Sequence, residues 1–306
     1  MLSTISQIKI KLNLYAGDSM NRQLGKTDYS LYPVGLGAMS LSIQGRPTTT
    51  EAIQVIQAFV ENGGNFIDTA NVYCLDDSDL GHNERLIHSA LALIGKNDYV
   101  LIATKGGLRR PRGEWIVDAH PTWLRTSCEQ SLRDLQRESI DLYYLHASDL
   151  KIPFEESLGA LMQLQQEGKI RYIGISNVNL QQLTLALRLT SIAAVQNRCN
   201  PFFKKDFHNG LIRQCQTQGV SYVPYSPFGG RHNYAHLSSY PLFQKLSKKY
   251  NASPYQISLA WLLQKDNNII PIPGTGKVKN VLDNTLSAKL RLNQEDIDAI
   301  DQIPED

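Results

Sequence analysis

Short apolar runs rich in β-branched residues alternate with longer amphipathic segments along this chain, from about Val34 onward. A short apolar run is typical of a buried strand, whereas apolar residues at helical spacing indicate a helix that covers a core. We therefore predict β-strands at residues 34–38, 65–69, 100–105, 140–146, 172–176, 193–196, 221–225 and 269–272. No Pro- or Gly-rich linker divides this series of eight, so the pattern predicts an α/β fold with one domain over residues 1–306, a closed (β/α)8 TIM barrel.

The segments between the predicted strands have the apolar spacing of helices that pack on a sheet. One such helix opens at residues 49–51, and the Asn-Gly-Gly sequence of residues 62–64 ends it. Similar apolar faces within residues 158–164 and 257–263 are typical of helices that cover a core.

Two connections between predicted elements are long enough to carry function. Residues 106–119 follow the third strand and residues 226–240 follow the seventh, so both lie on the C-terminal side of the barrel, where sites occur. We expect these loops to shape a substrate pocket or to cover a cofactor. Residues 1–33 are predicted to form an N-terminal extension and a β-hairpin that closes the opposite end, with Gly25 and Asp28 as turn signals.

The composition, with 42% hydrophobic and 20% charged residues, indicates a folded protein with a sizeable core. The net charge of +2 supplies no field that would attract nucleic acid or an anionic membrane. No apolar stretch reaches the roughly 20 residues of a membrane-spanning helix, and residues 1–18 contain no uninterrupted apolar segment typical of a secretory signal.

The four cysteines lie far apart without a CxxC pair, which indicates a reducing compartment and argues against a disulfide framework or a zinc site. The chain also lacks an HxH pair, and His232 with His236 falls in a predicted loop, so no metal site is expected. Together with the absence of a signal segment, these patterns predict a cytoplasmic protein.

Four polar residues fall at or just after the ends of predicted strands: Asp68, Tyr73, Lys105 and His146. A parallel barrel would bring these strand ends to one rim, where such groups form a proton-transfer site because each tunes its neighbours. A free tyrosine titrates near ~10, and a cation about 4 Å away would lower the pKa of Tyr73 by roughly 3 units before burial opposes it. Such a site protonates an oxygen on which negative charge develops, as carbonyl reduction requires.

Each of the four residues also has an ordinary structural interpretation. Asp68 would cap the turn after its strand, and Tyr73 would be an exposed loop aromatic. Lys105 would be a solvated strand end, and His146 a hydrogen-bonded core residue. Four unrelated structural roles at one rim are much less expected than a single proton-transfer site, so the joint pattern favours the site.

Segments spread over nearly the whole chain resemble the aldo-keto reductases, namely NFIDTANVY, LIATKGG, IDLYYLH, IRYIGISN, VQNRCNPF, YVPYSPFGG and IPIPGTGKVKNVLDN. The resemblance implies a (β/α)8 barrel that binds a nicotinamide cofactor without a Rossmann domain. It also implies a catalytic tetrad in which Tyr73 is the general acid, Lys105 and Asp68 tune it, and His146 orients the carbonyl.

The same resemblance implies the residues that hold the cofactor. The carboxamide of the nicotinamide would be bound by Ser176, Asn177 and Gln196, and the ring would stack on Tyr225. The pyrophosphate would lie along Ser226, Pro227, Phe228 and Gly229. The adenosine end would be received by a C-terminal segment comprising Gly274, Thr275, Gly276, Lys277, Asn280, Asp283 and Asn284, with Lys277 beside a 2′-phosphate and Asp283 and Asn284 at the adenine.

Three positions depart from the family pattern. Asn280 stands where many members have an arginine beside the 2′-phosphate, so NADPH is favoured over NADH on the strength of Lys277, by a reduced margin. Cys74 stands where glycine is common and would alter the pocket floor or create an oxidisable site. Cys199 stands where an aromatic residue is common.

The resemblance implies an NADPH-dependent oxidoreductase that reduces a small aldehyde or ketone to an alcohol. The segments YVPYSPFGG, SLAWLLQ and IPIPGTG are similar to the bacterial branch that includes pyridoxal reductases, so a pyridoxal-type aldehyde is one candidate substrate. The alternative is a regulatory protein similar to the β-subunits of voltage-gated potassium channels, which would use bound NADPH as a redox sensor with slow or no turnover. A complete tetrad favours the enzyme.

Overall fold

The computed structural model describes residues 20–230 and 233–305 of the chain, so the expectations for residues 1–18 and for His232 lie outside the described residues. The strands are β1 Arg22–Gln23, β2 Ser30–Leu31, β3 Leu36–Gly37, β4 Phe66–Asp68, β5 Leu101–Gly106, β6 Leu108–Arg109, β7 Ile116–Val117, β8 Ile140–Leu145, β9 Ile170–Ser176, β10 Ile192–Gln196 and β11 Ser221–Tyr222. The α-helices are α2 Thr49–Glu61, α3 His82–Leu93, α4 Pro121–Leu135, α5 Phe154–Gln166, α6 Leu180–Leu189, α7 Lys205–His208, α8 Leu211–Gln218, α9 Tyr234–Ser239, α10 Pro241–Tyr250, α11 Pro254–Lys265, α12 Val278–Leu286 and α13 Gln294–Asp301. Short 3-10 helices are η1 Ala38–Leu41, η2 Asp77–Asp79, η3 Pro111–Gly113 and η4 Ser287–Lys289.

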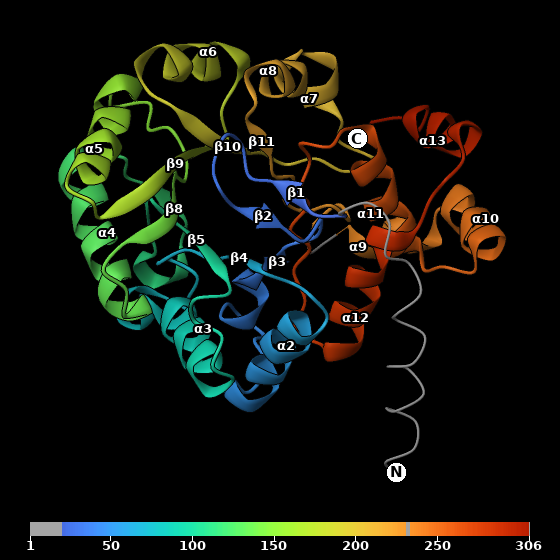
Figure 1. The fold of residues 1–306 in the computed structure, drawn as a ribbon, viewed down its shortest axis with the longest axis horizontal. Helices are drawn as coiled ribbons and strands as arrows, with labels where there is room; N and C mark the ends of the chain where they lie inside the picture. Colours follow the sequence, from blue (N-terminus) through green and yellow to red (C-terminus); the bar gives the residue numbers. More distant parts are fainter. Residues whose placement is uncertain (1–19, 231–232, 306) are drawn as a thin grey trace.

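Within the described residues, seven parallel strands form one curled sheet in the order β11-β10-β9-β8-β5-β4-β3. Figure 1 shows these strands on the inside, with helices such as α2, α3, α4 and α5 around them. Apart from the β6–β7 hairpin inserted after β5, each strand pairs with the next one along the chain, which is the order of a TIM-barrel type fold. Seven of the predicted strands are confirmed, with ends that differ by a few residues.

The eighth predicted strand, at residues 269–272, is not a regular strand. Pro271 has no backbone N–H and cannot donate to a ladder. The segment instead shares its hydrogen bonds between two neighbours. The Ile270 amide donates to the Tyr222 carbonyl at 2.9 Å, and the Gly35 amide donates to the Pro271 carbonyl at 2.9 Å. Backbone hydrogen bonds therefore join this segment to β11 on one side and to the start of β3 on the other.

Helix α2 begins and ends where the sequence signals indicate. At the start of α2, Thr48 Oγ1 accepts from the Glu51 amide at 3.3 Å and Glu51 Oε2 accepts from the Thr48 amide at 2.9 Å, which is a capping box. Asn62 follows the last residue of α2. Helices α5 and α11 bury the apolar faces predicted for them. No helix in the described ranges is long and apolar enough to cross a membrane.

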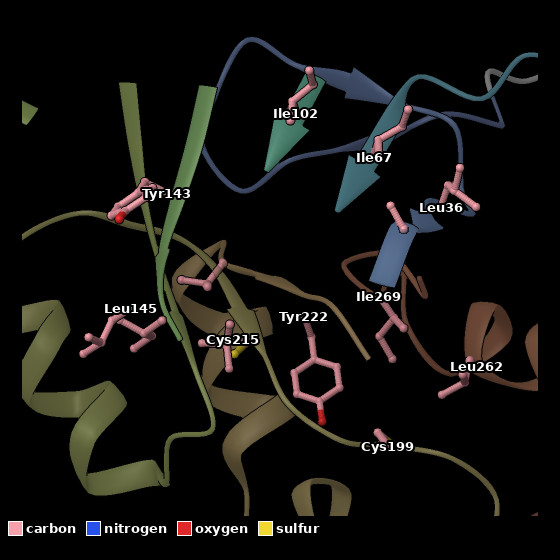
Figure 2. Packing of buried hydrophobic residues seen from close by; sticks show 14 of the residues in the cluster. Leu36, Ile67, Ile102, Tyr143, Leu145, Cys199, Cys215, Tyr222, Leu262 and Ile269 are labelled. Atoms are coloured by element: carbon pink, nitrogen blue, oxygen red, sulfur yellow. The ribbon is translucent and has the colours of Figure 1, made fainter. Parts of the chain in front are cut away.

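Side chains alternate between two apolar layers along the strands. Leu36, Ile67 and Ile102 belong to the main core, which they share with the helices that surround the sheet (Figure 2). Their neighbours Phe66 and Leu101 belong to a second cluster formed mostly by strand residues. Because successive side chains of a strand point to opposite faces, the second cluster fills the inside of the curled sheet.

Tyr144 on β8 belongs to this inner layer and lies against Gly174, its partner on β9. A Cβ at residue 174 would lie 2.4 Å from a ring carbon of Tyr144. We expect Gly174→Ala to lower the free energy of unfolding in urea by about 1–3 kcal/mol. Gly159→Ala in α5 is the control, because no described atom lies within 4 Å of the added methyl group. It should be neutral or stabilising by roughly 0.5–1 kcal/mol, and equal losses in both variants would contradict the packing explanation.

The N-terminal hairpin pairs β1 with β2 in antiparallel fashion. Tyr29 Oη donates to Asp141 Oδ1 at 2.8 Å, and the Gly25 amide donates to Ser221 Oγ at 2.8 Å. Asp141 and Ser221 lie at the starts of β8 and β11. The hairpin therefore contacts the N-terminal ends of the barrel strands, away from the strand ends at which the candidate site residues lie.

Candidate active site

The four predicted tetrad residues meet at the C-terminal ends of neighbouring strands. Asp68 ends β4, Lys105 lies near the end of β5, and His146 directly follows β8. Lys105 Nζ donates to Asp68 Oδ1 at 2.6 Å and to Tyr73 Oη at 3.0 Å. The rings of Tyr73 and His146 lie edge to face with their centroids 5.9 Å apart. The parallel sheet therefore brings all four side chains together, as the strand pattern predicts.

Lys105 is fully buried, and each of its ammonium hydrogens has an acceptor. The third acceptor, which the sequence did not indicate, is the carbonyl of Thr69 at 2.8 Å. Burial favours the neutral amine, but the attraction of Asp68 and Tyr73 outweighs it and raises the pKa of Lys105. Asp68 Oδ2 also accepts from Gln196 Nε2 at 2.7 Å, so both carboxylate oxygens have partners. Lys105 thus presents a fixed positive charge to Tyr73.

The pKa of Tyr73 differs from the sequence-based expectation. Burial raises this pKa above its ordinary value of 10.0, and the opposing effect of Lys105 does not overcome it. Lys105 does lower the pKa, as predicted, but burial and the nearby Asp68 carboxylate raise it by more, so the net shift is opposite to the one that the cation alone would give. Tyr73 is therefore protonated at neutral pH, which is the form that can donate a proton.

His146 is neutral at this site. Burial and the charge of Lys105 hold the pKa of His146 well below its ordinary value of 6.5. Its backbone carbonyl accepts from Asn177 Nδ2 at 2.9 Å, which fixes the chain beside the ring. A neutral imidazole keeps one N–H donor, which suits a hydrogen bond to a carbonyl oxygen.

The residues predicted to bind the nicotinamide gather on the same rim. Tyr225 Oη donates to Asn177 Oδ1 at 2.8 Å, and Ser176 Oγ donates to the Gln196 carbonyl at 2.7 Å. Asn177 has φ 56°, a left-handed conformation that asparagine tolerates better than most residues. Gln196 also contacts Asp68. The amide and hydroxyl groups of these residues lie beside the aromatic ring of Tyr225, and together they fit a planar ring that bears a carboxamide.

The predicted pyrophosphate loop has a backbone that suits a phosphate. Ser226 and Gly229 have φ 51° and 90°, and the Gly229 amide donates to the Ser226 carbonyl at 3.0 Å. Phe228 packs on Tyr255 of α11 with ring centroids 5.0 Å apart, and the Pro227 carbonyl accepts from a serine of the same helix. In turns that contain left-handed residues, the N–H groups of successive residues can converge on a concavity that binds an anion.

The C-terminal segment predicted to bind the adenosine end of the cofactor lies at the start of α12. Gly274 pairs with Gly37 of β3, which brings the segment to the barrel rim. Thr275 Oγ1 accepts from the Lys277 amide at 3.1 Å and from Asn280 Nδ2 at 3.2 Å. The side chain of Lys277 is exposed at the N-cap of α12, where the helix dipole also favours an anion. Gly276 lies between these residues and packs near a proline of the loop before α2.

Asp283 and Asn284 are placed less directly for the predicted adenine contact. The Asp283 carboxylate accepts from the Ser253 hydroxyl, and its carbonyl accepts from Gln256 Nε2 at 3.1 Å, so Asp283 ties α12 to α11. Asn284 is buried. Their role in binding adenine stays a prediction.

Trp115 is a site residue that the sequence did not single out. It lies in the 106–119 connection, and its ring meets Tyr73 edge to face with centroids 6.3 Å apart. The guanidinium of Arg110 covers the ring at 3.7 Å, yet 46% of Trp115 remains exposed. Its only sequence signal is that it is an aromatic residue in the long loop that follows the predicted strand at 100–105.

Cys74, next to Tyr73, is buried, and burial raises its pKa to about 12. The thiol is therefore protonated at neutral pH, which is unfavourable for a redox role. In the described ranges, no group of three or more His, Cys, Asp or Glu side chains is arranged to hold a metal ion. His236 instead packs on Phe202 with ring centroids 4.7 Å apart.

Comparison with known proteins gives a consistent result. The family model described as Aldo/keto reductase family matches residues 33–305. A probable aldo-keto reductase of Glycine max is 32% identical over 304 residues, which cover 90% of this chain and 86% of that protein. The solved structure of an aldo-keto reductase from Bacillus halodurans matches 93% of this chain and 96% of its own at 26% identity and a TM-score of 0.77. The glycerol dehydrogenase of Gluconobacter oxydans matches 94% and 95% at 26% identity and a TM-score of 0.80.

Proposed function

The chain belongs to the aldo/keto reductase family and is therefore a nicotinamide-dependent oxidoreductase that acts on carbonyl groups, and from this premise we propose that it uses NADPH to reduce an aldehyde or ketone, with Tyr73 as general acid. The observation that carries the proposal is the 3.0 Å contact between Tyr73 Oη and Lys105 Nζ. This contact places a proton donor beside a permanent cation at the rim where the other predicted site residues meet.

The proton is held and released by the chain's own residues. Burial keeps Tyr73 protonated in the resting site, so the acid is loaded before the carbonyl arrives. As negative charge develops on the substrate oxygen, Tyr73 donates its proton, and the ammonium of Lys105 stabilises the phenolate that forms. Asp68 holds that ammonium in place, and His146 donates a hydrogen bond that orients the carbonyl oxygen.

We assign the cofactor to the residues described above, from Ser176, Asn177, Gln196 and Tyr225 at the nicotinamide end to the start of α12 at the adenosine end. A reduced nicotinamide bound there supplies the hydride for the carbonyl carbon. The amide, hydroxyl and aromatic groups at one end and the exposed Lys277 at the helix N-cap support this placement. We also infer that the N-terminal hairpin closes the far end of the barrel.

Cofactor preference is tested by Lys277→Ala. If Lys277 binds the 2′-phosphate, the Michaelis constant for NADPH should rise roughly tenfold, or ~1.4 kcal/mol, while the constant for NADH, which lacks that phosphate, should stay unchanged. Lys289→Ala is the matched control, since this exposed lysine lies beyond the other end of α12. Equal increases for both cofactors in Lys277→Ala would remove the case for 2′-phosphate recognition.

The function itself is tested by following the absorbance of NADPH and NADH with a panel of small aldehydes, ketones and pyridoxal. Pyridoxal belongs in the panel because of the resemblance to the pyridoxal reductase branch and because the exposed ring of Trp115 beside Tyr73 offers a flat wall for an aromatic aldehyde. Reduction of at least one carbonyl is expected. Tight NADPH binding without turnover of any member would instead favour the redox-sensing alternative.

A further inference from the structure

A buried acid stands directly behind the catalytic strand β5. Lys105 points into the barrel, so its neighbour Thr104 points outward to the helices, because successive strand residues face opposite sides. Thr104 Oγ1 donates to Glu84 Oε1 on α3 at 2.5 Å. Glu84 is completely buried, and the proton-transfer steps described above do not use it.

The cation that acts on Glu84, Arg85, offsets its burial only in part. Arg85, its neighbour on α3, binds Asp134 of α4 at 2.9 Å. The other ionisable groups that face Glu84 are Asp134 and Cys128 on α4 and Tyr143 on β8, and none of them is positive. An ionised carboxylate here would be a buried charge that Thr104 and Arg85 compensate only in part. Burial accordingly raises the pKa of Glu84 from 4.5 to about 7.

One oxygen of this acid is free to carry the proton. Glu84 Oε2 and the hydroxyl of Ser131 on α4 are both buried and have no hydrogen-bond partner among the described residues. They are near enough to interact but do not meet in hydrogen-bond geometry. A neutral acid, with its proton on Oε2 and Thr104 bound to Oε1, therefore matches the site better than a carboxylate.

The first turn of α3 makes a second contact with a residue that adjoins the tetrad. Asn83, next to Glu84, accepts from Thr69 Oγ1 at 2.5 Å and donates to the Ala38 carbonyl at 2.9 Å. The carbonyl of Thr69 is itself an acceptor for Lys105 Nζ. Two adjacent residues of α3 thus hold the residues next to Asp68 and Lys105 from outside the barrel.

We propose that Glu84 is a positioning residue, which as a neutral acid holds Thr104 and thereby keeps Lys105 in contact with Tyr73 and Asp68. The proposal rests on the reductase function inferred above. Ionisation of Glu84 draws its carboxylate toward water and away from the strand, so the 3.0 Å contact between Lys105 and Tyr73 loosens and proton transfer slows. The enzyme therefore loses activity as Glu84 ionises.

The stability of the fold also depends on whether Glu84 carries its proton. In the unfolded chain Glu84 ionises near 4.5, whereas in the folded chain it keeps its proton to about 7. The protonated acid therefore makes its full contribution to the stability of the fold below pH 4.5. This contribution is lost as the pH rises from 4.5 to about 7, and above about 7 the stability no longer depends on Glu84 ionisation.

The test compares the wild-type chain with Glu84→Gln, whose amide has nearly the shape of the neutral acid and does not ionise. As the pH rises through about 7, wild-type kcat should fall roughly tenfold with little change in the Michaelis constant for the cofactor, while kcat of Glu84→Gln stays level. The melting temperature of the variant should gain on that of the wild type as the pH rises. Glu51→Gln, an exposed capping residue, should reproduce the wild-type profile.

Two further measurements keep the outcome decisive. Thr104→Val removes the hydroxyl that Glu84 holds and should lower kcat at every pH. The infrared C=O band of a buried carboxylic acid should be present in the wild type near neutral pH and absent from Glu84→Gln. Superimposable pH profiles for wild type and Glu84→Gln, or an inactive Glu84→Gln, would overturn the proposal. If no form reduces a carbonyl, the proposed function fails, while the melting and infrared measurements still decide whether Glu84 carries the proton.

Discussion

Tyr73→Phe is expected to lower kcat for carbonyl reduction by roughly 10²- to 10⁴-fold and to leave cofactor binding unchanged. The phenol is a protonated group 3.0 Å from the fixed charge of Lys105, and phenylalanine keeps the ring but has no proton to give. The edge-to-face contacts of this ring with His146 and Trp115 should persist, so the pocket keeps its shape. Steady-state kinetics together with cofactor binding by fluorescence quenching measure the two effects separately.

Tyr99→Phe is the matched control for this experiment. Tyr99 is 48% exposed and precedes β5, at the opposite end of that strand from the catalytic rim, so its hydroxyl should not affect kcat. A Tyr73→Phe variant that reduces carbonyls at the wild-type rate would exclude Tyr73 as the acid. A loss of cofactor affinity as large as the loss of kcat would show instead that the hydroxyl holds the cofactor site.

The positions of the tetrad residues were predictable because strand ends are visible in a sequence. Asp68, Lys105 and His146 each follow a β-branched apolar run, and a parallel sheet must bring such ends to one rim. The barrel order follows from the same runs. The segment at 269–272 shows where this signal fails, because its apolar pattern resembles a strand while Pro271 prevents a regular ladder.

The electrostatics of the site were not predictable in the same way. The sequence shows that a lysine and a tyrosine can meet, but not that burial outweighs the lysine and raises the pKa of Tyr73. Glu84 is a similar case, because within an amphipathic helix it has the sequence pattern of a surface residue. Its burial depends on how α3 packs on β5 and α4, which is decided by tertiary contacts far apart in the chain.

Lys105→Met should destabilise the fold as well as abolish reduction. Methionine fills a similar volume, but it removes one of the two side-chain donors to Asp68. The buried carboxylate then keeps only the hydrogen bond from Gln196 Nε2 of these two. Breaking a buried ion pair on one side costs about 3–5 kcal/mol, because the other charge stays uncompensated. The loss should appear in the free energy of unfolding from urea titrations at neutral pH.

The double variant Asp68→Asn with Lys105→Met separates charge from packing. Asparagine removes the stranded charge, so most of the lost stability should return while reduction stays abolished. Burial raises the pKa of Asp68 even with Lys105 present, so the single variant should also regain stability as the pH falls and Asp68 takes up a proton. If the double variant were as unstable as Lys105→Met, and acid brought no recovery, the cost would lie in lost packing. The Asp68–Lys105 pair would then support proton donation by Tyr73 without adding to the stability of the fold.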